Sequence, residues 1–145
     1  MKVAKLRYST DDLKHIAFFE SNTKAKVIDF LRQNDTLCFV IAKGDMGLAI
    51  GKAGAKIDKI RKSLSKQVIV FEFDDVPENF IKNMLHPIEV YAIEVANTSD
   101  EKTALVQLSI EDRSRAVGQG GSRLKIMKQL AKRHHNVDDI RIKAI

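Results

Sequence analysis

The chain has 145 residues, 44% of them hydrophobic and 30% charged, which is typical of one ordinary globular domain or two small ones. Its 25 lysines and arginines outnumber its 19 acidic residues, and the resulting net charge of +6 suits an anionic partner such as nucleic acid. No apolar run is long enough to span a membrane and the start resembles no signal peptide, so we expect a cytoplasmic protein without a membrane partner.

The first predicted elements are a helix and two strands. The helix is expected to begin at a capping box, Ser9 to Asp12, and to end at about Ser21. Its predicted apolar stripe consists of Leu13, Ile16 and Ala17. Two runs rich in β-branched and aromatic residues, 25–33 and 36–44, follow as strands separated by a short polar turn.

Cys38, the only cysteine, lies in the second of these apolar strands. A single cysteine excludes an internal disulfide and a thiolate metal cluster. We interpret Cys38 as a small buried hydrophobe, with a catalytic thiol as the alternative.

Two helices separated by glycines come next. A short helix, 46–50, is predicted with Asp45 as its N-cap residue, and a longer helix follows over 55–65. The longer helix has three inward-facing apolar residues at helical spacing: Ile57, Ile60 and Leu64. Each glycine inside a continuous helix would cost about 1 kcal/mol relative to alanine, so Gly51 and Gly54 indicate a break between two helices. A strand over 67–73 ends this half.

An acidic turn with a proline, 74–80, marks the boundary between two similar halves, because Pro77 suits the first position of a helix. We therefore predict two domains, 1–75 and 76–145. In the second half Asp112 is a predicted N-cap residue, and the elements repeat the first order: helix 77–85, strands 88–96 and 103–110, helices 113–117 and 122–134, and strand 139–145. The predicted fold class is α+β, with the order α-β-β-α-α-β twice.

The two halves also match when the chain is shifted by 67 positions, which places residues 45–60 on 112–127. The matching glycines are Gly51 with Gly118, and Gly54 with Gly121. Upstream, the same shift places Leu13, Ala17 and Phe18 on Phe80, Met84 and Leu85. One shift that holds over most of the chain predicts a tandem repeat.

A Gly-x-x-Gly break between two helices suits phosphate binding. Glycine permits a tight turn and close approach of another backbone, and the following helix presents unpaired N–H groups and a positive dipole end. Lys52 adds a cation to the first turn. Further basic residues follow each turn: Lys56, Lys59, Arg61, Lys62 and Lys66 in the first half, and Arg123, Lys125, Lys128, Lys132 and Arg133 in the second. The alternative for such charges is a solvated helix face.

The stretches "AIGKAGAKI" (49–57) and "AVGQGGSRL" (116–124) resemble the Ile-Gly-x-x-Gly-x-x-Ile signature of KH domains. The helix-first order resembles the type II form of that fold. The tandem arrangement and the ending "LAKRHHNVDDIRIK" resemble archaeal NusA-like transcription termination/antitermination factors. The resemblance implies a three-stranded mixed sheet packed against helices in each domain, and single-stranded RNA bound beside each Gly-x-x-Gly loop. RNA polymerase is a further candidate partner.

The resemblance also implies which residues bind RNA. The two clamps are Gly51, Lys52, Ala53 and Gly54 in the first domain, and Gly118, Gln119, Gly120 and Gly121 in the second. The adjoining candidates are Ile50, Lys56, Ile57, Lys59, Val117, Arg123 and Leu124, of which the apolar ones have core packing as the alternative. Because Gln119 stands in the position of Lys52, we hypothesise weaker RNA binding by the second domain.

No catalytic, metal or cofactor site is evident, so we predict a non-enzymatic factor. We also expect the protein to be a monomer. A Walker A loop is excluded because Met46 and Ala53 occupy positions that need glycine and Ser or Thr. His134 and His135 end a helix, where a cation suits the dipole better than a metal site. The predicted function is RNA binding in transcription termination or antitermination. A KH-fold adaptor docking on RNA polymerase or the ribosome is the alternative, an enzyme acting on nucleic acid ranks last, and single-stranded DNA is an alternative ligand.

Overall fold

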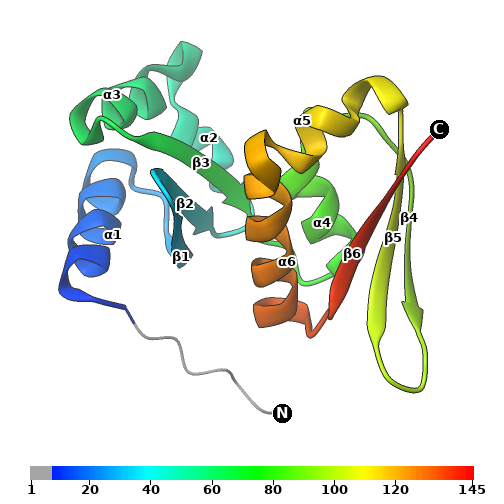
Figure 1. The fold of residues 1–145 in the computed structure, drawn as a ribbon. Coiled ribbons are helices and arrows are strands. Elements are labelled where there is room, and N and C mark those ends of the chain that lie inside the picture. The colour runs from blue at the N-terminus through cyan, green and yellow to red at the C-terminus, as the bar shows by residue number, and fades with distance from the viewer. Residues whose placement is uncertain (1–7) are drawn as a thin grey trace. The chain divides into compact units, whose positions relative to one another are not determined.

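The computed structural model describes residues 8–145 (Figure 1). The chain divides into two compact units, Met1–Phe73 and Asp74–Ile145. In both units a helix and a β-hairpin are followed by two helices and a third strand, which confirms the predicted α+β class and its element order. The division falls two residues before the predicted boundary. The assignment of 1–75 and 76–145 as separate RNA-binding domains stays a prediction.

The first unit packs its helices on one face of a three-stranded mixed sheet (Figure 1). Its elements are α1 (Thr10–Thr23), β1 (Val27–Gln33), β2 (Thr36–Ile41), α2 (Met46–Ile50), α3 (Ala55–Leu64) and β3 (Gln67–Glu72). The central strand β2 is antiparallel to β1 and parallel to β3. Its residues from Leu37 to Ile41 are all fully buried, which confirms the interpretation of Cys38 as a buried hydrophobe.

Helix α1 begins at the predicted capping box. Ser9 Oγ accepts a hydrogen bond from Asp12 N at 3.1 Å, and the Asp12 carboxylate accepts one from Ser9 N at 3.1 Å. The predicted apolar stripe is wrong in part, because Leu13 is 55% exposed and Ala17 is also exposed. The buried residues of this helix are Phe19 and Thr23. Apolar residues lie on several sides of α1, so helical spacing alone did not identify the packed face.

The second unit has the same architecture. Its elements are α4 (Pro77–Leu85), β4 (Val90–Asn97), β5 (Lys102–Leu108), α5 (Arg113–Val117), α6 (Ser122–His135) and β6 (Asp139–Ala144). Strand β5 is central, antiparallel to β4 and parallel to β6. Helix α4 starts at Pro77 and ends before Pro87, as predicted, and its buried residues are Phe80, Ile81, Met84 and Leu85.

The two units do not match at a single sequence shift. Ile41 and Leu108 stand 67 positions apart, but their strand partners Val27 and Val90 stand 63 apart. The second hairpin is four residues longer, with one more paired residue in each strand and two more in its turn. The predicted matches of Leu13, Ala17 and Phe18 with Phe80, Met84 and Leu85 are therefore wrong.

Asp45 and Asp112 occupy the N-cap positions of α2 and α5, but neither side chain caps its helix. The Asp45 carboxylate instead accepts a hydrogen bond from Lys26 N at 2.9 Å. Asp112 ends a short 3₁₀ turn and accepts a hydrogen bond from the Arg115 guanidinium at 3.4 Å. The predicted N-cap positions are thus confirmed, but the carboxylates bind other donors and make no capping hydrogen bond. Within residues 8–145, no helix is both long and apolar enough to cross a membrane.

Candidate nucleic-acid interface

Helices α2 and α3 meet at the turn from Gly51 to Gly54. Gly51 has φ 76° and ψ 176°, a combination that essentially only glycine adopts. Ala53 and Gly54 follow with φ of 52° and 76°, both in the left-handed region, and α3 then begins. The Gly54 N–H donates to Gly51 O at 3.2 Å and closes the turn. The break between the two helices is therefore a defined turn, in which three of the four residues have a positive φ.

The turn between α5 and α6 follows the same backbone path. Gly118 has φ 81° and ψ 168°, and Gly120 and Gly121 have φ of 62° and 78°. The Gly121 N–H donates to Gly118 O at 3.0 Å. The turns differ at their third position, where Ala53 adopts a left-handed conformation that costs a non-glycine residue about 1–2 kcal/mol. Gly120 adopts the corresponding conformation without that strain.

The first glycine of each turn is also required by packing. A Cβ on Gly51 would lie 2.7 Å from Lys56 Cγ and 3.0 Å from Lys56 N. A Cβ on Gly118 would lie 2.7 Å from Arg123 Cβ and 2.8 Å from Arg123 N. By contrast, a Cβ on Gly121 would meet no atom within 4 Å. The two turns are thus packed tightly on one side and open on the other.

The open side of each turn presents backbone donors. The first N–H groups after a helix start have no intrahelical acceptor, and they carry the positive end of the helix dipole. Lys52 and Ala53 lie in the turn just before α3, beside this helix end, and both are exposed. Gln119 and Gly120 lie in the turn just before α6 and are exposed as well. This arrangement favours an anion such as a phosphate group.

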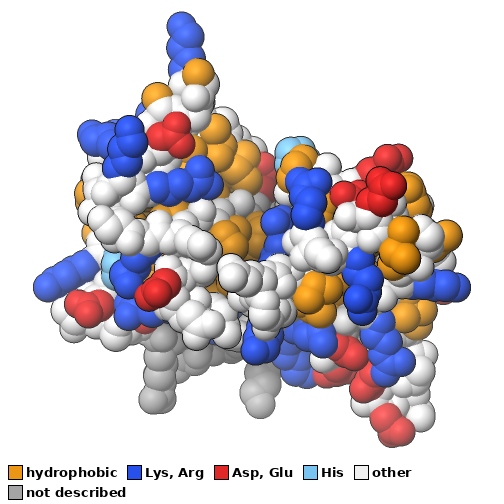
Figure 2. All heavy atoms as spheres, turned by 45° about the horizontal axis from the view of Figure 1, so that its top comes forward, with side chains coloured by type: hydrophobic (Ala, Val, Ile, Leu, Met, Phe, Trp, Pro, Cys, Tyr) orange, Lys and Arg blue, Asp and Glu red, His pale blue; other side chains and the backbone are white. Residues whose placement is uncertain are grey.

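The cations near the first turn remain largely available to solvent. Lys52, Lys59 and Lys62 are exposed, and Figure 2 shows basic side chains gathered over the part of the first unit that carries α2 and α3. Arg61 lies 3.8 Å from Asp58 in an exposed ion pair, which is worth little in water. The positive potential around the first turn is therefore only weakly compensated by neighbouring acids.

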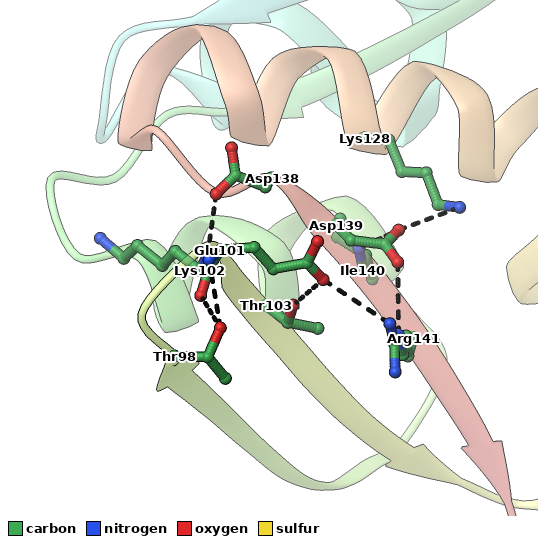
Figure 3. Close-up of polar contacts among 9 residues, drawn as sticks. All are labelled: Thr98, Glu101, Lys102, Thr103, Lys128, Asp138, Asp139, Ile140 and Arg141. Carbon is green, nitrogen blue, oxygen red and sulfur yellow. Dashed lines mark hydrogen bonds and ion pairs between the residues drawn. The ribbon is translucent and has the colours of Figure 1, made fainter.

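Two cations of α6, Lys128 and Lys132, are instead paired with acids from β6 and the loop before it. Lys128 Nζ lies 3.1 Å from Asp139 Oδ1 (Figure 3), and Lys132 Nζ lies 2.6 Å from Asp138 Oδ1. The hydrogen bond from Lys132 lowers the pKa of Asp138 below its ordinary value. Burial opposes ionisation of Asp139, but hydrogen bonds from Lys128 and Arg141 outweigh it, so the pKa of Asp139 is lowered too. The helix carries no acid of its own, so its sequence did not reveal this compensation.

The same acids belong to a polar cluster that joins β5, β6 and the end of α6 (Figure 3). Lys102 N donates to Asp138 Oδ2 at 2.8 Å, and Lys102 Nζ donates to His135 O at 3.3 Å. Glu101 Oε1 lies 3.6 Å from Arg141 and accepts a hydrogen bond from Thr103 at 2.8 Å. We assign this cluster a structural role, because its charges are satisfied by one another.

Two predicted RNA-binding cations face the first helix of their own unit. Lys56 Nζ donates to Thr23 O at 3.4 Å, at the end of α1. Arg123 donates to Met84 O at 2.6 Å and to His86 O at 3.3 Å, at the end of α4. These contacts could not be foreseen from the sequence, because the acceptors are backbone carbonyls more than 30 positions away.

The apolar signature residues divide by burial. Ile57 is 4% exposed and belongs to the core of the first unit, so it offers almost no surface to a ligand. Ile50, Val117 and Leu124 are partly exposed beside the turns. Among the predicted apolar contacts, these three have surface that a nucleic-acid base could reach.

His135, at the end of α6, has a structural environment. Its Nε2 lies 2.8 Å from Asp74 O, and its ring packs against Phe80. Burial lowers the pKa of His135, and the charges of His134 and Lys102 lower it further against an opposing contribution from the Asp74 carbonyl. Within residues 8–145, no group of three or more His, Cys, Asp or Glu side chains is placed to hold a metal ion.

Two α-β-β-α-α-β units, each with a mixed sheet and a Gly-x-x-Gly turn between consecutive helices, define a protein with tandem type II KH domains. The family of NusA-like second KH domains matches residues 77–144. The solved structure titled "Crystal structure of APE1850" is similar, with a TM-score of 0.76 and 25% identity over 94% of this chain and 100% of that chain.

Relatives named "Probable transcription termination protein NusA" match nearly the whole chain. The protein of Halobacterium salinarum is 34% identical over 137 residues, which are 94% of this chain and 98% of the relative. That of Halococcus morrhuae is 31% identical over 138 residues, with 95% and 99% covered. That of Methanocaldococcus jannaschii is 26% identical over 140 residues, with 97% and 76% covered. The chain belongs to this NusA-like family.

Proposed function

We propose that this protein is an RNA-binding transcription termination or antitermination factor that holds single-stranded RNA at its two Gly-x-x-Gly turns. Its NusA-like relatives carry names that refer to transcription termination, and KH domains bind single-stranded nucleic acid beside such turns. Each turn accommodates about four nucleotides, so one strand that reached both turns would gain affinity from the linkage of two weak sites.

The geometry of the turns is the observation that carries this proposal. In both units a helix begins directly after a turn with two exposed residues, Lys52 and Ala53 or Gln119 and Gly120. The positive end of the helix dipole favours a phosphate at such a turn. The proposed contacts are these residues with their flanking glycines, together with Lys59 and the partly exposed Ile50, Val117 and Leu124.

The two proposed clamps are unequal. The first combines Lys52 with the exposed Lys59. The second has Gln119 in place of the lysine, and ion pairs engage Lys128 and Lys132 of its following helix. Because phosphate contacts supply most of the affinity for single strands, the first turn is proposed to bind more tightly.

A charge-reversal experiment tests the proposal. Replacing Lys52 and Ala53 together by aspartate should lower the affinity of the full chain for a fluorescent single-stranded RNA dodecamer at least about tenfold, measured by anisotropy. Both positions are exposed, and aspartate tolerates the left-handed conformation of Ala53 better than most residues. The matched control replaces Lys14 and Ala17, exposed on α1, by aspartate. Equal affinities in the two double variants would refute clamping at the first turn.

RNA polymerase is proposed as a partner that is reached through the bound transcript. Capture of polymerase by the protein should then disappear when ribonuclease is added. Capture that survives ribonuclease and the Lys52, Ala53 double variant would instead support a KH-fold adaptor that docks directly on polymerase or the ribosome. The aspartate variant distinguishes these outcomes because it changes only the surface of the first turn.

A further inference from the structure

We infer that Lys56 and Arg123 are positioning residues that fasten each Gly-x-x-Gly turn to the first helix of its own unit. This inference rests on the proposed function, since it assigns to these two cations the task of shaping the RNA-binding turns. It replaces the direct RNA contact that the resemblance implies for them. Three observations carry it: the packing of their stems, the direction of their charged groups, and their equivalence in the two units.

The stem of each side chain fills the space beside the first glycine. A Cβ on Gly51 would come within 2.7 Å of Lys56 Cγ, and a Cβ on Gly118 within 2.7 Å of Arg123 Cβ. The glycine and the cation five positions later are therefore in close contact, and the backbone of the turn rests on the aliphatic part of the cation. Long basic side chains commonly bury their stems in this way while their heads reach a polar group.

The charged heads point to helix ends and not to the open side of the turn. Lys56 Nζ donates to Thr23 O, and Arg123 donates to Met84 O at 2.6 Å. The last carbonyl groups of a helix lack intrahelical donors and form the negative end of its dipole, which favours a cation. Helix α1 has no basic residue in its own last turn, so Lys56 supplies the cation from α3.

The two contacts are equivalent although their sequences differ in spacing. Lys56 and Arg123 stand 67 positions apart, whereas Thr23 and Met84 stand 61 apart. The insertions between the units thus leave the contact in place. In both units a long basic side chain reaches the end of the first helix. This repetition indicates that the Gly-x-x-Gly turn needs the contact to keep its conformation.

The test compares Lys56→Ala with Lys59→Ala, a change of equal charge at an exposed position of the same helix. In the free full chain, Lys56→Ala should shift the ¹H–¹⁵N resonances of Gly51 and Gly54, whereas Lys59→Ala should leave them unchanged. In the second unit, Arg123→Lys should restore the Gly118 and Gly121 resonances that Arg123→Ala displaces. Turn resonances in Lys56→Ala that coincide with those of the wild type would overturn the inference.

RNA titrations add a readout that separates positioning from contact. With the single-stranded RNA dodecamer as probe, Lys56→Ala should weaken binding about fivefold, the equivalent of one lost hydrogen bond, at every salt concentration. The slope of log affinity against log salt should stay unchanged, whereas loss of a phosphate contact would reduce it by about 0.7. A slope reduced to that extent would overturn the positioning role. Failure of the wild-type chain to bind RNA would overturn the proposed function alone, since the resonance comparison uses the free protein.

Discussion

The glycines of the second turn should differ sharply in the cost of replacement by alanine, although all three have positive φ. Gly118 lies in a region of backbone space that is essentially closed to other residues, and a Cβ there meets the backbone of Arg123 at 2.8 Å. Gly120 and Gly121 lie in the ordinary left-handed region, where an added Cβ meets no atom within 4 Å. Strain and overlap therefore act together at Gly118, but strain acts alone at the other two.

The magnitudes follow from these terms. At Gly118, backbone strain of about 1–3 kcal/mol and overpacking of about 1–3 kcal/mol predict a loss of about 4 kcal/mol in the free energy of unfolding. At Gly120 and Gly121, a left-handed alanine costs about 1–2 kcal/mol. Alanine also lowers the conformational entropy of the unfolded chain, which stabilises the folded state by about 0.4–1 kcal/mol. The expected net loss at each of these positions is about 1 kcal/mol.

Urea unfolding followed by far-ultraviolet circular dichroism measures these differences in the absence of RNA. Gly47→Ala in α2 is the matched control, because Gly47 has a helical φ and open space around it, so alanine should stabilise by up to about 1 kcal/mol. A Gly118→Ala variant within about 1 kcal/mol of Gly121→Ala would refute the claim that packing dictates the first glycine.

Three further outcomes are expected. Lys52→Gln should weaken RNA binding and reduce the slope of log affinity against log salt by about 0.7. Gln119→Lys should strengthen RNA binding and increase that slope by about the same amount. Equal slopes for the two variants would count against unequal clamps. Ala53→Gly should raise the free energy of unfolding by about 0.5 kcal/mol, because the relief of about 1–2 kcal/mol of backbone strain exceeds the entropic cost of glycine. A loss of stability in urea unfolding would contradict a strained conformation at Ala53. Burial lowers the folded-state pKa of His135, so its contribution to stability is present above the ordinary value near 6.5 and falls as pH drops through the lowered pKa. His135→Gln should accordingly flatten the loss of stability on acidification from neutral pH, and a wild-type pH profile in that variant would refute the assignment.

Local chemistry explains why so many helix limits were predictable. The capping box at Ser9 and Asp12 forms as expected, α4 starts at Pro77, and α2 and α5 end at the glycines that follow them. Each of these limits depends on a residue that acts on its own backbone or on a neighbour within one turn. Such signals are contained in short stretches of sequence and require no knowledge of the remaining fold.

Partners that lie far away in the chain account for the failures. Leu13 and Ala17 have the spacing of a packed stripe, but tertiary packing places Phe19 and Thr23 of α1 against the core instead. The carboxylate of Asp45 is engaged by Lys26 N, across the start of β1, and so does not cap α2. In each case the local sequence allowed more than one packed face or hydrogen-bond partner, and a contact with a residue distant in the chain determined which one formed.

The sequence by itself determined that the chain contains one unit twice, that each unit breaks its paired helices with Gly-x-x-Gly, and that one turn carries a lysine where the other has glutamine. Tertiary structure alone decided which cations remain available beside those turns. Lys56 and Arg123 reach helix ends, and Lys128 and Lys132 reach acids near β6, whereas Lys52 stays exposed. The physical reason is that the availability of a charge depends on partners brought close by folding, whereas the conformation of a glycine turn depends on the residues of the turn itself.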